Sequence, residues 1–251
     1  MQTPRIVIIE DEMIIAHDVK QTLVNMGYEV PLVTGSGEAA LKKIKDIRPD
    51  LVLMDIMLKG RMNGIDAAAK THDIYNIPVV YMTANADKKT IERAKKTEPY
   101  GLIYKPVKSE VLHAVIEMAL YKHKMESKLI EHDAQLKATL NSIGDAVIST
   151  DKNSKIVSMN PVAEKLTGWN FNDAEGRPLT EVFNIVNALT GEKAVNPVKK
   201  VLELGTVVGL ANHTKLISKD GNEYQIADSG SPIIDINGEI TGVVMVFRDV
   251  T

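Results

Sequence analysis

Four short apolar segments in the first half of the sequence end in side chains suited to phosphoryl chemistry. Glu10 and Asp11 follow the first of these segments, and Asp55 follows the second. Thr83 follows the third, and Lys105 follows the last. If the segments are parallel strands, these side chains meet beyond the carboxyl ends of the strands, where open parallel sheets bind ligands.

Such a group suits the transfer of a phosphoryl group to a carboxylate. Clustered carboxylates repel one another unless a cation lies between them, and Mg²⁺ prefers oxygen ligands of this kind. Together with Lys105, the ion neutralises charge on the transferred group, and the Thr83 hydroxyl can hydrogen-bond one of its oxygens. Asp55 leaves a central strand and is the best candidate for the nucleophile.

A haloacid-dehalogenase-like phosphatase also combines an aspartate nucleophile with Mg²⁺. That family requires an Asp-x-Asp sequence after its first strand. Here Asp55-Ile56-Met57 follows the third strand-like run, which excludes this alternative.

The pattern around these residues alternates between strand and helix. Apolar runs of strand length lie at 6–9, 28–33, 51–54, 79–82 and 102–104. Segments with apolar residues at helical spacing lie between these runs, and Gly27, Ser36 and Pro49 stand where helix ends are expected. Five strands alternating with helices predict an α/β fold with a doubly wound, five-stranded parallel sheet covered on both faces.

Four motifs in this order, IVIIEDE, LVLMDI, VVYMTA and YKP, give residues 4–122 a resemblance to the receiver (response-regulator) family. The resemblance implies a flavodoxin-like fold in which a partner histidine kinase phosphorylates Asp55. It also implies a site with Asp11 and Asp55 as direct Mg²⁺ ligands, Glu10 acting through water, the Met57 carbonyl as a further ligand, and Thr83 and Lys105 at the phosphoryl group.

Two features depart from the common pattern of this family. The loop from Ile56 to Gly64 is one residue longer than usual. The position three residues before Lys105, where the family places a switching aromatic residue, holds Leu102, whereas Tyr104 directly precedes the lysine. The usual coupling between threonine and an aromatic rotamer therefore lacks its aromatic partner at residue 102.

The second half has a different pattern of predicted helices and strands. Residues 109–143 contain neither Pro nor Gly and predict one long helix. Beyond it, strand patterns at 146–150, 155–159, 214–218, 223–234 and 240–247, with helical stretches after Pro161 and near 197–204, predict an α+β fold with an antiparallel sheet. The motifs NSIGDAVISTD, MNPVAEKLTGW, GLANHTKLISKDG and GVVMVFRDVT make this half similar to PAS sensor domains, with Asp249 and Thr251 in the exit motif.

The boundaries expected on this basis are a receiver domain at 1–122, a helical coiled-coil linker at 123–142 and a PAS domain at 143–251. No flavin or haem is expected in the PAS domain, because the chain has no cysteine and its single histidine in this half, His213, precedes a strand. That histidine is interpreted as structural or superficial, and Trp169 as a packing aromatic. The PAS ligand is unknown.

The linker predicts a parallel homodimer. Counted in heptads from residue 115, one core position holds Val115, Lys122, Leu129, Leu136 and Ile143, and the other holds Met118, Met125, His132 and Thr139. Seven of these nine residues can face a partner without burying a charge, and Lys122 can extend its ammonium to water. The alternative is a single solvated helix that only separates the domains.

The chain is therefore expected to be a signalling input module whose parent is a histidine kinase. His123 and His132 lack the sequence context of a kinase phosphoacceptor, and no kinase or cyclase catalytic motif lies in the 251 residues. The effector would be C-terminal or a separate protein. The alternative is a stand-alone receiver-PAS adaptor that recruits a partner protein.

The composition limits the partners. The net charge of −3 gives no general affinity for nucleic acid or anionic membranes, and no apolar run is long enough to span a bilayer. The N-terminal sequence enters a strand almost at once, which leaves no room for a signal peptide. We expect a cytoplasmic protein.

Overall fold

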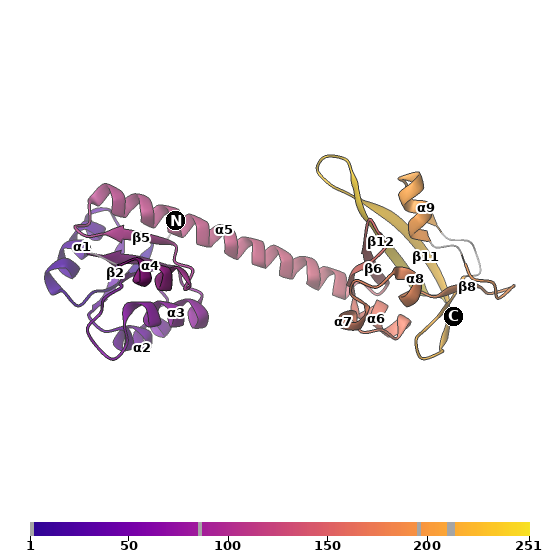
Figure 1. The fold of residues 1–251 in the computed structure, drawn as a ribbon, viewed down its shortest axis with the longest axis horizontal. Helices are drawn as coiled ribbons and strands as arrows, with labels where there is room; N and C mark the ends of the chain where they lie inside the picture. The colour runs from indigo at the N-terminus through magenta and orange to yellow at the C-terminus, as the bar shows by residue number, and fades with distance from the viewer. Residues whose placement is uncertain (1–2, 85–86, 195–196, 210–213) are drawn as a thin grey trace. The chain divides into compact units, whose positions relative to one another are not determined.

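The structure, a computed structural model, describes residues 3–84, 87–194, 197–209 and 214–251. The chain divides into two compact units, Met1–Glu131 and His132–Thr251 (Figure 1). The predicted fold class is confirmed: a five-stranded parallel sheet lies in the first unit, an antiparallel sheet lies in the second, and a long helix runs from one into the other.

The first unit is a doubly wound parallel sheet. Across the sheet the strands run in the order β2 (Glu29–Thr34), β1 (Arg5–Ile9), β3 (Leu51–Asp55), β4 (Val79–Thr83) and β5 (Gly101–Tyr104). All four pairings are parallel. The winding reverses between β1 and β3, so the topological switch point lies at the carboxyl ends of these two central strands.

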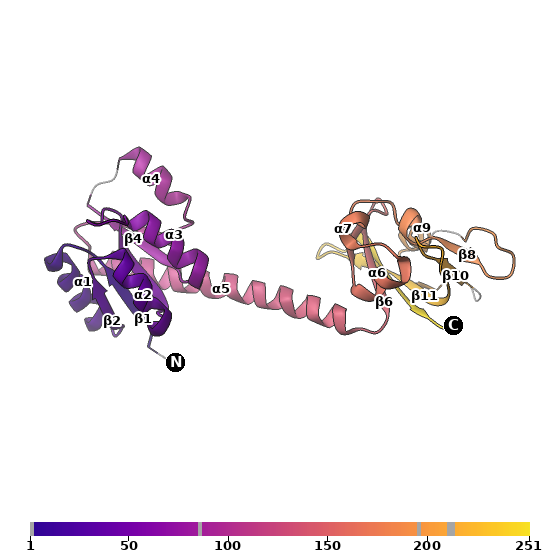
Figure 2. The same ribbon diagram turned by 90° about the horizontal axis from the view of Figure 1, so that it is seen from below.

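Helices cover both faces of this sheet (Figure 2). They are α1 (Met13–Asn25), α2 (Gly37–Ile47), α3 (Gly64–Tyr75), α4 (Lys88–Lys95) and α5 (Ser109–Ser142). Helices α1 and α5 pack with Ile6 and Ile8 on one face, while α2, α3 and α4 pack with Val7 and Ile9 on the other. The central strands are apolar at every core position because successive side chains enter two different cores.

Local side-chain contacts set the ends of the helices. The Ser36 hydroxyl accepts a hydrogen bond from the Ala39 amide at 3.3 Å, which caps α2 as the sequence predicted. This helix ends at Arg48, which is in the left-handed region (φ 47°) directly before Pro49. Asn63 caps α3 by accepting from the Asp66 amide at 2.9 Å, and this cap fixes the end of the loop that follows β3.

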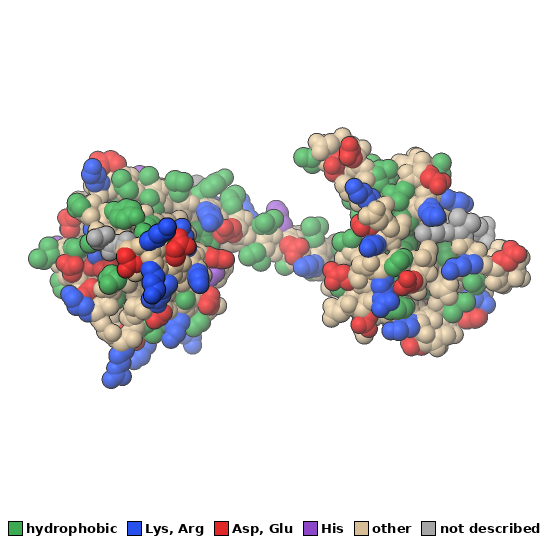
Figure 3. All heavy atoms as spheres, in the orientation of Figure 1, with side chains coloured by type: hydrophobic (Ala, Val, Ile, Leu, Met, Phe, Trp, Pro, Cys, Tyr) green, Lys and Arg blue, Asp and Glu red, His purple; other side chains and the backbone are tan. Residues whose placement is uncertain are grey.

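Helix α5 is 34 residues long, but only Leu112, Ile116 and Ala119 are buried. Two tyrosines hold its flanks: Tyr28 donates to Glu117 at 2.6 Å, and Tyr100 donates to Glu126. From residue 131 to residue 143 every side chain is exposed. Hydrophobic side chains lie among charged ones along this exposed part of the helix (Figure 3).

The second unit is an antiparallel sheet with helices inserted between its strands. The order across the sheet is β7 (Ile156–Met159), β6 (Ala146–Asp151), β12 (Ile240–Asp249), β11 (Glu223–Ile234), β10 (Thr214–Ile217) and β8 (Ile185–Asn187), and β9 (Val208–Gly209) also pairs with β11. The helices are α6 (Pro161–Thr167), α7 (Phe171–Ala174), α8 (Leu179–Val182) and α9 (Pro197–Leu204). Apolar side chains from the strands and from the inserted helices form one core.

The last strand ends in a hydrogen-bonded turn. Asp249 accepts hydrogen bonds from the Thr251 amide at 2.9 Å and from its hydroxyl at 2.6 Å. The Thr251 hydroxyl in turn accepts from the Gln225 amide at 3.2 Å, which ties the exit of β12 to β11. No helix in the described ranges has both the length and the hydropathy to cross a bilayer.

Candidate functional site

The sheet brings the sequence-predicted acids, hydroxyl and lysine together at one edge. Glu10 and Asp11 follow β1, Asp55 is the last residue of β3, Thr83 is the last residue of β4, and Lys105 follows β5. Carboxylate oxygens of Glu10, Asp11 and Asp55 all lie within 4.8 Å of one another. The site therefore occupies the switch point of the sheet.

Burial makes this acidic cluster unusual. The Glu10 side chain is fully buried and Asp55 is 4% exposed. Loss of water around Glu10 raises its pKa, and the nearby Asp55 charge raises it further, while the hydrogen bond from Lys105 opposes both effects. Three carboxylates at this spacing need cationic partners to stay ionised.

Lys105 is the principal cationic partner. Its ammonium lies 2.6 Å from a Glu10 oxygen and 2.7 Å from Asp55 Oδ2, and its side chain is 6% exposed. Burial alone lowers the pKa of Lys105, but the hydrogen bonds to Asp55 and Glu10 outweigh burial and raise it. The Lys105 amide donates to the Thr83 carbonyl at 2.8 Å, which fixes the start of the loop after β5.

Thr83 presents a hydroxyl that lacks a partner. The residue is fully buried, and its Oγ1 makes no hydrogen bond in the described part of the chain. Buried hydroxyls are normally satisfied, because burying one without a partner costs free energy. An oxygen-rich ligand held between Asp55 and Lys105 would supply the acceptor that Thr83 lacks.

The donor set fits a hard divalent ion. Glu10, Asp11 and Asp55 offer carboxylate oxygens only, which are the ligands that Mg²⁺ prefers. Met57 lies in the loop after β3, where its amide donates to Asp55 Oδ1 at 2.9 Å. The role expected for the Met57 carbonyl stays a prediction.

Two residues near the site were not singled out from the sequence. A Cβ atom on Gly64, the first residue of α3, would lie 1.8 Å from the backbone oxygen of Asp55. The Lys59 ammonium lies 3.1 Å from Asp11 Oδ2. The Asn63-Gly64 pair is a local turn signal, but nothing in the sequence indicates that it lies against Asp55.

Leu102 and Tyr104, the two residues of the changed aromatic position, have different surroundings. Leu102 is partly buried against the core that includes α4, whereas the Tyr104 side chain is 57% exposed. Tyr104 pairs with Thr83 in the β4–β5 register. Tyr104, the aromatic residue next to Lys105 in the sequence, is therefore exposed to solvent and does not pack in the core.

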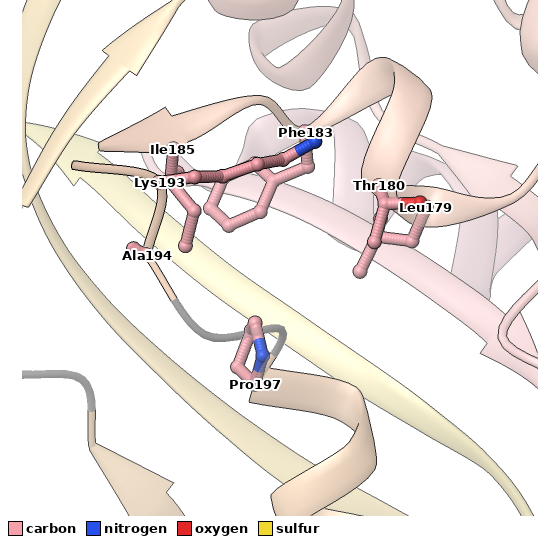
Figure 4. Close-up of a pocket in the computed structure, with 7 residues that line it drawn as sticks. All are labelled: Leu179, Thr180, Phe183, Ile185, Lys193, Ala194 and Pro197. Atoms are coloured by element: carbon pink, nitrogen blue, oxygen red, sulfur yellow. The ribbon is translucent and has the colours of Figure 1, made fainter.

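One of the pockets of the second unit is small and lies between α8, β8 and the start of α9 (Figure 4). Its space of about 20 Å³ is enough for one water molecule. The lining residues are Leu179, Thr180, Phe183, Ile185, Lys193, Ala194 and Pro197. The nature of a PAS ligand stays open, and His213 lies outside the described residues.

Trp169 and Asp228 are two partly buried side chains of the second unit with distinct surroundings. Trp169 packs against the apolar core, and the Lys219 ammonium lies 4.1 Å from its ring centroid, in keeping with the predicted packing role. Asp228 lies on β11 with one carboxylate oxygen that has no partner in the described residues. Burial raises the pKa of Asp228 to about 7.

Comparison with known proteins divides the chain in the same way. Residues 6–117 match the family described as "Response regulator receiver domain", and residues 134–250 match the family described as "PAS fold".

Relatives match about half of the chain. The transcriptional regulatory protein PdtaR of Mycobacterium tuberculosis is 32% identical over 120 residues, which cover 48% of this chain and 58% of PdtaR. The probable diguanylate cyclase DgcE of Escherichia coli is 32% identical over 128 residues, which cover 51% of this chain and 11% of DgcE. The chain thus spans little more than half the length of PdtaR and a small part of DgcE.

Among solved structures, the signal receiver domain of a modulated diguanylate cyclase from Desulfovibrio desulfuricans G20 is 38% identical. It covers 50% of this chain and 99% of its own, with a TM-score of 0.49.

Proposed function

We propose that the chain is a response regulator receiver domain followed by a PAS domain, a two-component signalling module whose input is phosphorylation of Asp55 by a partner histidine kinase. The observation that carries this proposal is the contact of Lys105 with Asp55 at 2.7 Å beside the unsatisfied hydroxyl of Thr83. A nucleophile, a fixed cation and a free hydrogen-bond donor then face one position.

In the proposed reaction, a carboxylate oxygen of Asp55 bonds to phosphorus while the bond from phosphorus to the kinase imidazole nitrogen breaks. The imidazole leaves with the electron pair of that bond. Lys105 compensates the charge on the phosphoryl oxygens, and Thr83 donates to one of them. Glu10, Asp11, Asp55 and the Met57 carbonyl would hold Mg²⁺, which supplies further compensation of negative charge when bound.

Phosphorylation can be tested with a small donor. With Mg²⁺ and acetyl phosphate, the protein should gain one phosphoryl group that is stable in acid and labile in alkali. Asp55→Asn should abolish labelling, whereas the matched change Asp46→Asn, at an exposed position of α2, should leave it intact. An Asp55→Asn variant that labels like the parent would show that the nucleophile is another residue.

We also propose that α5 carries the signal as part of a parallel dimer. The core positions Met118, Leu129 and Leu136 are 71%, 71% and 65% exposed, so no described part of the chain covers this stripe. Val115, in contrast, packs against the receiver core, and Lys122 lies over the Tyr100 ring at 5.0 Å. The seam available to a partner therefore begins after the first turns of α5.

A pair of variants separates pairing from general surface effects. Leu136→Glu places a carboxylate on the seam, whereas Ile130→Glu places one at an outward heptad position of nearly equal exposure, 64% against 65%. Sedimentation at tens of micromolar should show a dimer for the parent and for Ile130→Glu, and a monomer for Leu136→Glu. A monomeric parent removes α5 pairing as the route of the signal.

The output of the module is proposed to lie in a domain beyond the PAS unit or in a separate effector. The resemblance to sensor proteins favours a histidine kinase, whereas similarity to DgcE favours a diguanylate cyclase. A receiver-PAS adaptor that recruits a partner protein is the alternative. The coding sequence after Thr251 distinguishes them: kinase motifs, a cyclase GGDEF motif or a stop codon each support one of the three.

A further inference from the structure

We propose that Lys59 is a regulatory cation of the acidic site, which competes with Mg²⁺ for Asp11 and so lowers the affinity of the receiver for the ion. This inference rests on the proposed function, because it concerns the same Mg²⁺ site. Lys59 belongs to the loop between β3 and α3, four residues after Asp55.

The two ammonium groups near the site divide the acids between them. Lys105 contacts Glu10 and Asp55, and Lys59 contacts Asp11 Oδ2 at 3.1 Å. Within the described residues, Lys59 is the sole cation that pairs with Asp11. Each carboxylate of the site therefore contacts a lysine of this chain, with two ammonium groups shared among three acids.

The two lysines differ in how firmly they are held. The Lys105 side chain is 6% exposed, so the protein encloses its ammonium on most sides. The Lys59 side chain is 84% exposed and contacts an acid that is 13% exposed. Lys59 can therefore move its ammonium into water with little loss of packing, while Lys105 cannot.

Lys59 and Mg²⁺ would use the same carboxylate. An ammonium at hydrogen-bond distance occupies a lone pair of Asp11, and its positive charge repels a second cation. A lysine ammonium carries its charge at neutral pH, and this one lies 3.1 Å from Asp11 Oδ2. Binding of the ion to Asp11 then either releases Lys59 or proceeds against its charge, and both effects weaken the apparent affinity.

The loop geometry supports a displaceable group. Gly60, which follows Lys59, has φ +155°, a conformation that L side chains rarely adopt, and a Cβ there would meet no atom within 4 Å. Lys59, Gly60 and Arg61 are all exposed, so the middle of the loop is not packed around the lysine. Its base is fixed, because the Gly64 amide donates to the Ile56 carbonyl at 3.2 Å.

The test is a Mg²⁺ titration by isothermal calorimetry of the full chain. Lys59→Gln should bind Mg²⁺ about two- to five-fold more tightly than the parent, the range expected for loss of one exposed ion pair. Lys43→Gln, an exposed lysine of α2 distant in sequence from the site, changes the net charge equally and should keep the parent affinity. Lys59→Arg keeps the charge and should also resemble the parent.

Ionic strength gives a second readout. The ratio between the affinities of Lys59→Gln and Lys43→Gln should shrink as salt rises toward about 1 M, where screening acts over a few ångströms. If Lys59→Gln and Lys43→Gln bind Mg²⁺ equally at low salt, the inference is wrong while the proposed function stands. If the parent binds no Mg²⁺, both are wrong.

Discussion

Among the described glycines of the first unit, Gly64 is the one at which an added Cβ atom would make the closest contact. It begins α3, and a Cβ atom at this position would lie 1.8 Å from the Asp55 carbonyl oxygen and 2.8 Å from its carbonyl carbon. Both contacts are with backbone, so no side-chain rotation can relieve them. Gly64→Ala must therefore move the start of α3 away from the end of β3.

The size of the effect follows from the contact. Real Cβ atoms essentially never approach other heavy atoms closer than 3.0 Å, so the backbones must separate by more than 1 Å. Overpacking of this kind costs about 3 kcal/mol. For a unit of this size, the receiver should unfold on the order of 10 °C lower. Displacement of Asp55 from Lys105 should also slow acetyl phosphate labelling by about 10-fold or more.

The assay is thermal unfolding followed by circular dichroism, together with labelling well below both melting temperatures. Gly144→Ala is the control, because a Cβ there meets nothing within 4 Å and its φ lies outside the left-handed region. Its melting temperature and labelling rate should equal those of the parent. A Gly64→Ala variant with parental stability and labelling would refute the argument that this contact positions Asp55.

Three further substitutions probe other parts of the chain. Tyr100→Phe removes the hydrogen bond to Glu126 and should raise amide exchange in α5 near that residue about 10-fold, whereas Tyr28→Phe should leave this stretch unchanged; equal exchange in both variants would contradict this. Asp228→Asn should raise the melting temperature of the PAS unit by a few degrees at pH 8.5 and little at pH 4.5. The raised pKa of about 7 favours the neutral acid in the folded state, so stability is lost as pH rises through 7; a gain independent of pH would contradict this reason. Gly242→Ala places a Cβ 2.0 Å from the Thr150 carbonyl oxygen and should destabilise the β6–β12 pairing by about 3 kcal/mol. The PAS unit should then unfold at a lower temperature and at a lower urea concentration than in the parent.

The sequence alone determined the fold class and the composition of the candidate site. Strands that are buried on both faces have apolar runs of a characteristic length, and the polar residue after each run must lie at one edge of the sheet. For this reason the sequence places Asp55, Thr83 and Lys105 together at this edge. The long α5 was equally readable, because neither Pro nor Gly interrupts it.

Short elements depended on the tertiary structure. Strands β8 and β9 have three and two residues, too few for a hydrophobic period to be recognised. They form because β10 and β11 offer backbone partners, as in the pairing of Ile185 with Leu216 and of Val208 with Gly230. Helices α7 and α8 have four residues each and were not predicted for the same reason.

The contacts that hold the site residues and α5 in place also depended on the tertiary structure. The approach of Gly64 to the Asp55 backbone and of Lys59 to Asp11 depends on the path of the loop after β3, which carries no periodic signal. Tyr100 reaches Glu126 across 26 positions of sequence, and only the packing of α5 beside β5 brings them together. Residue types and strand ends specify which groups can react, whereas close packing of distant segments specifies how those groups are held.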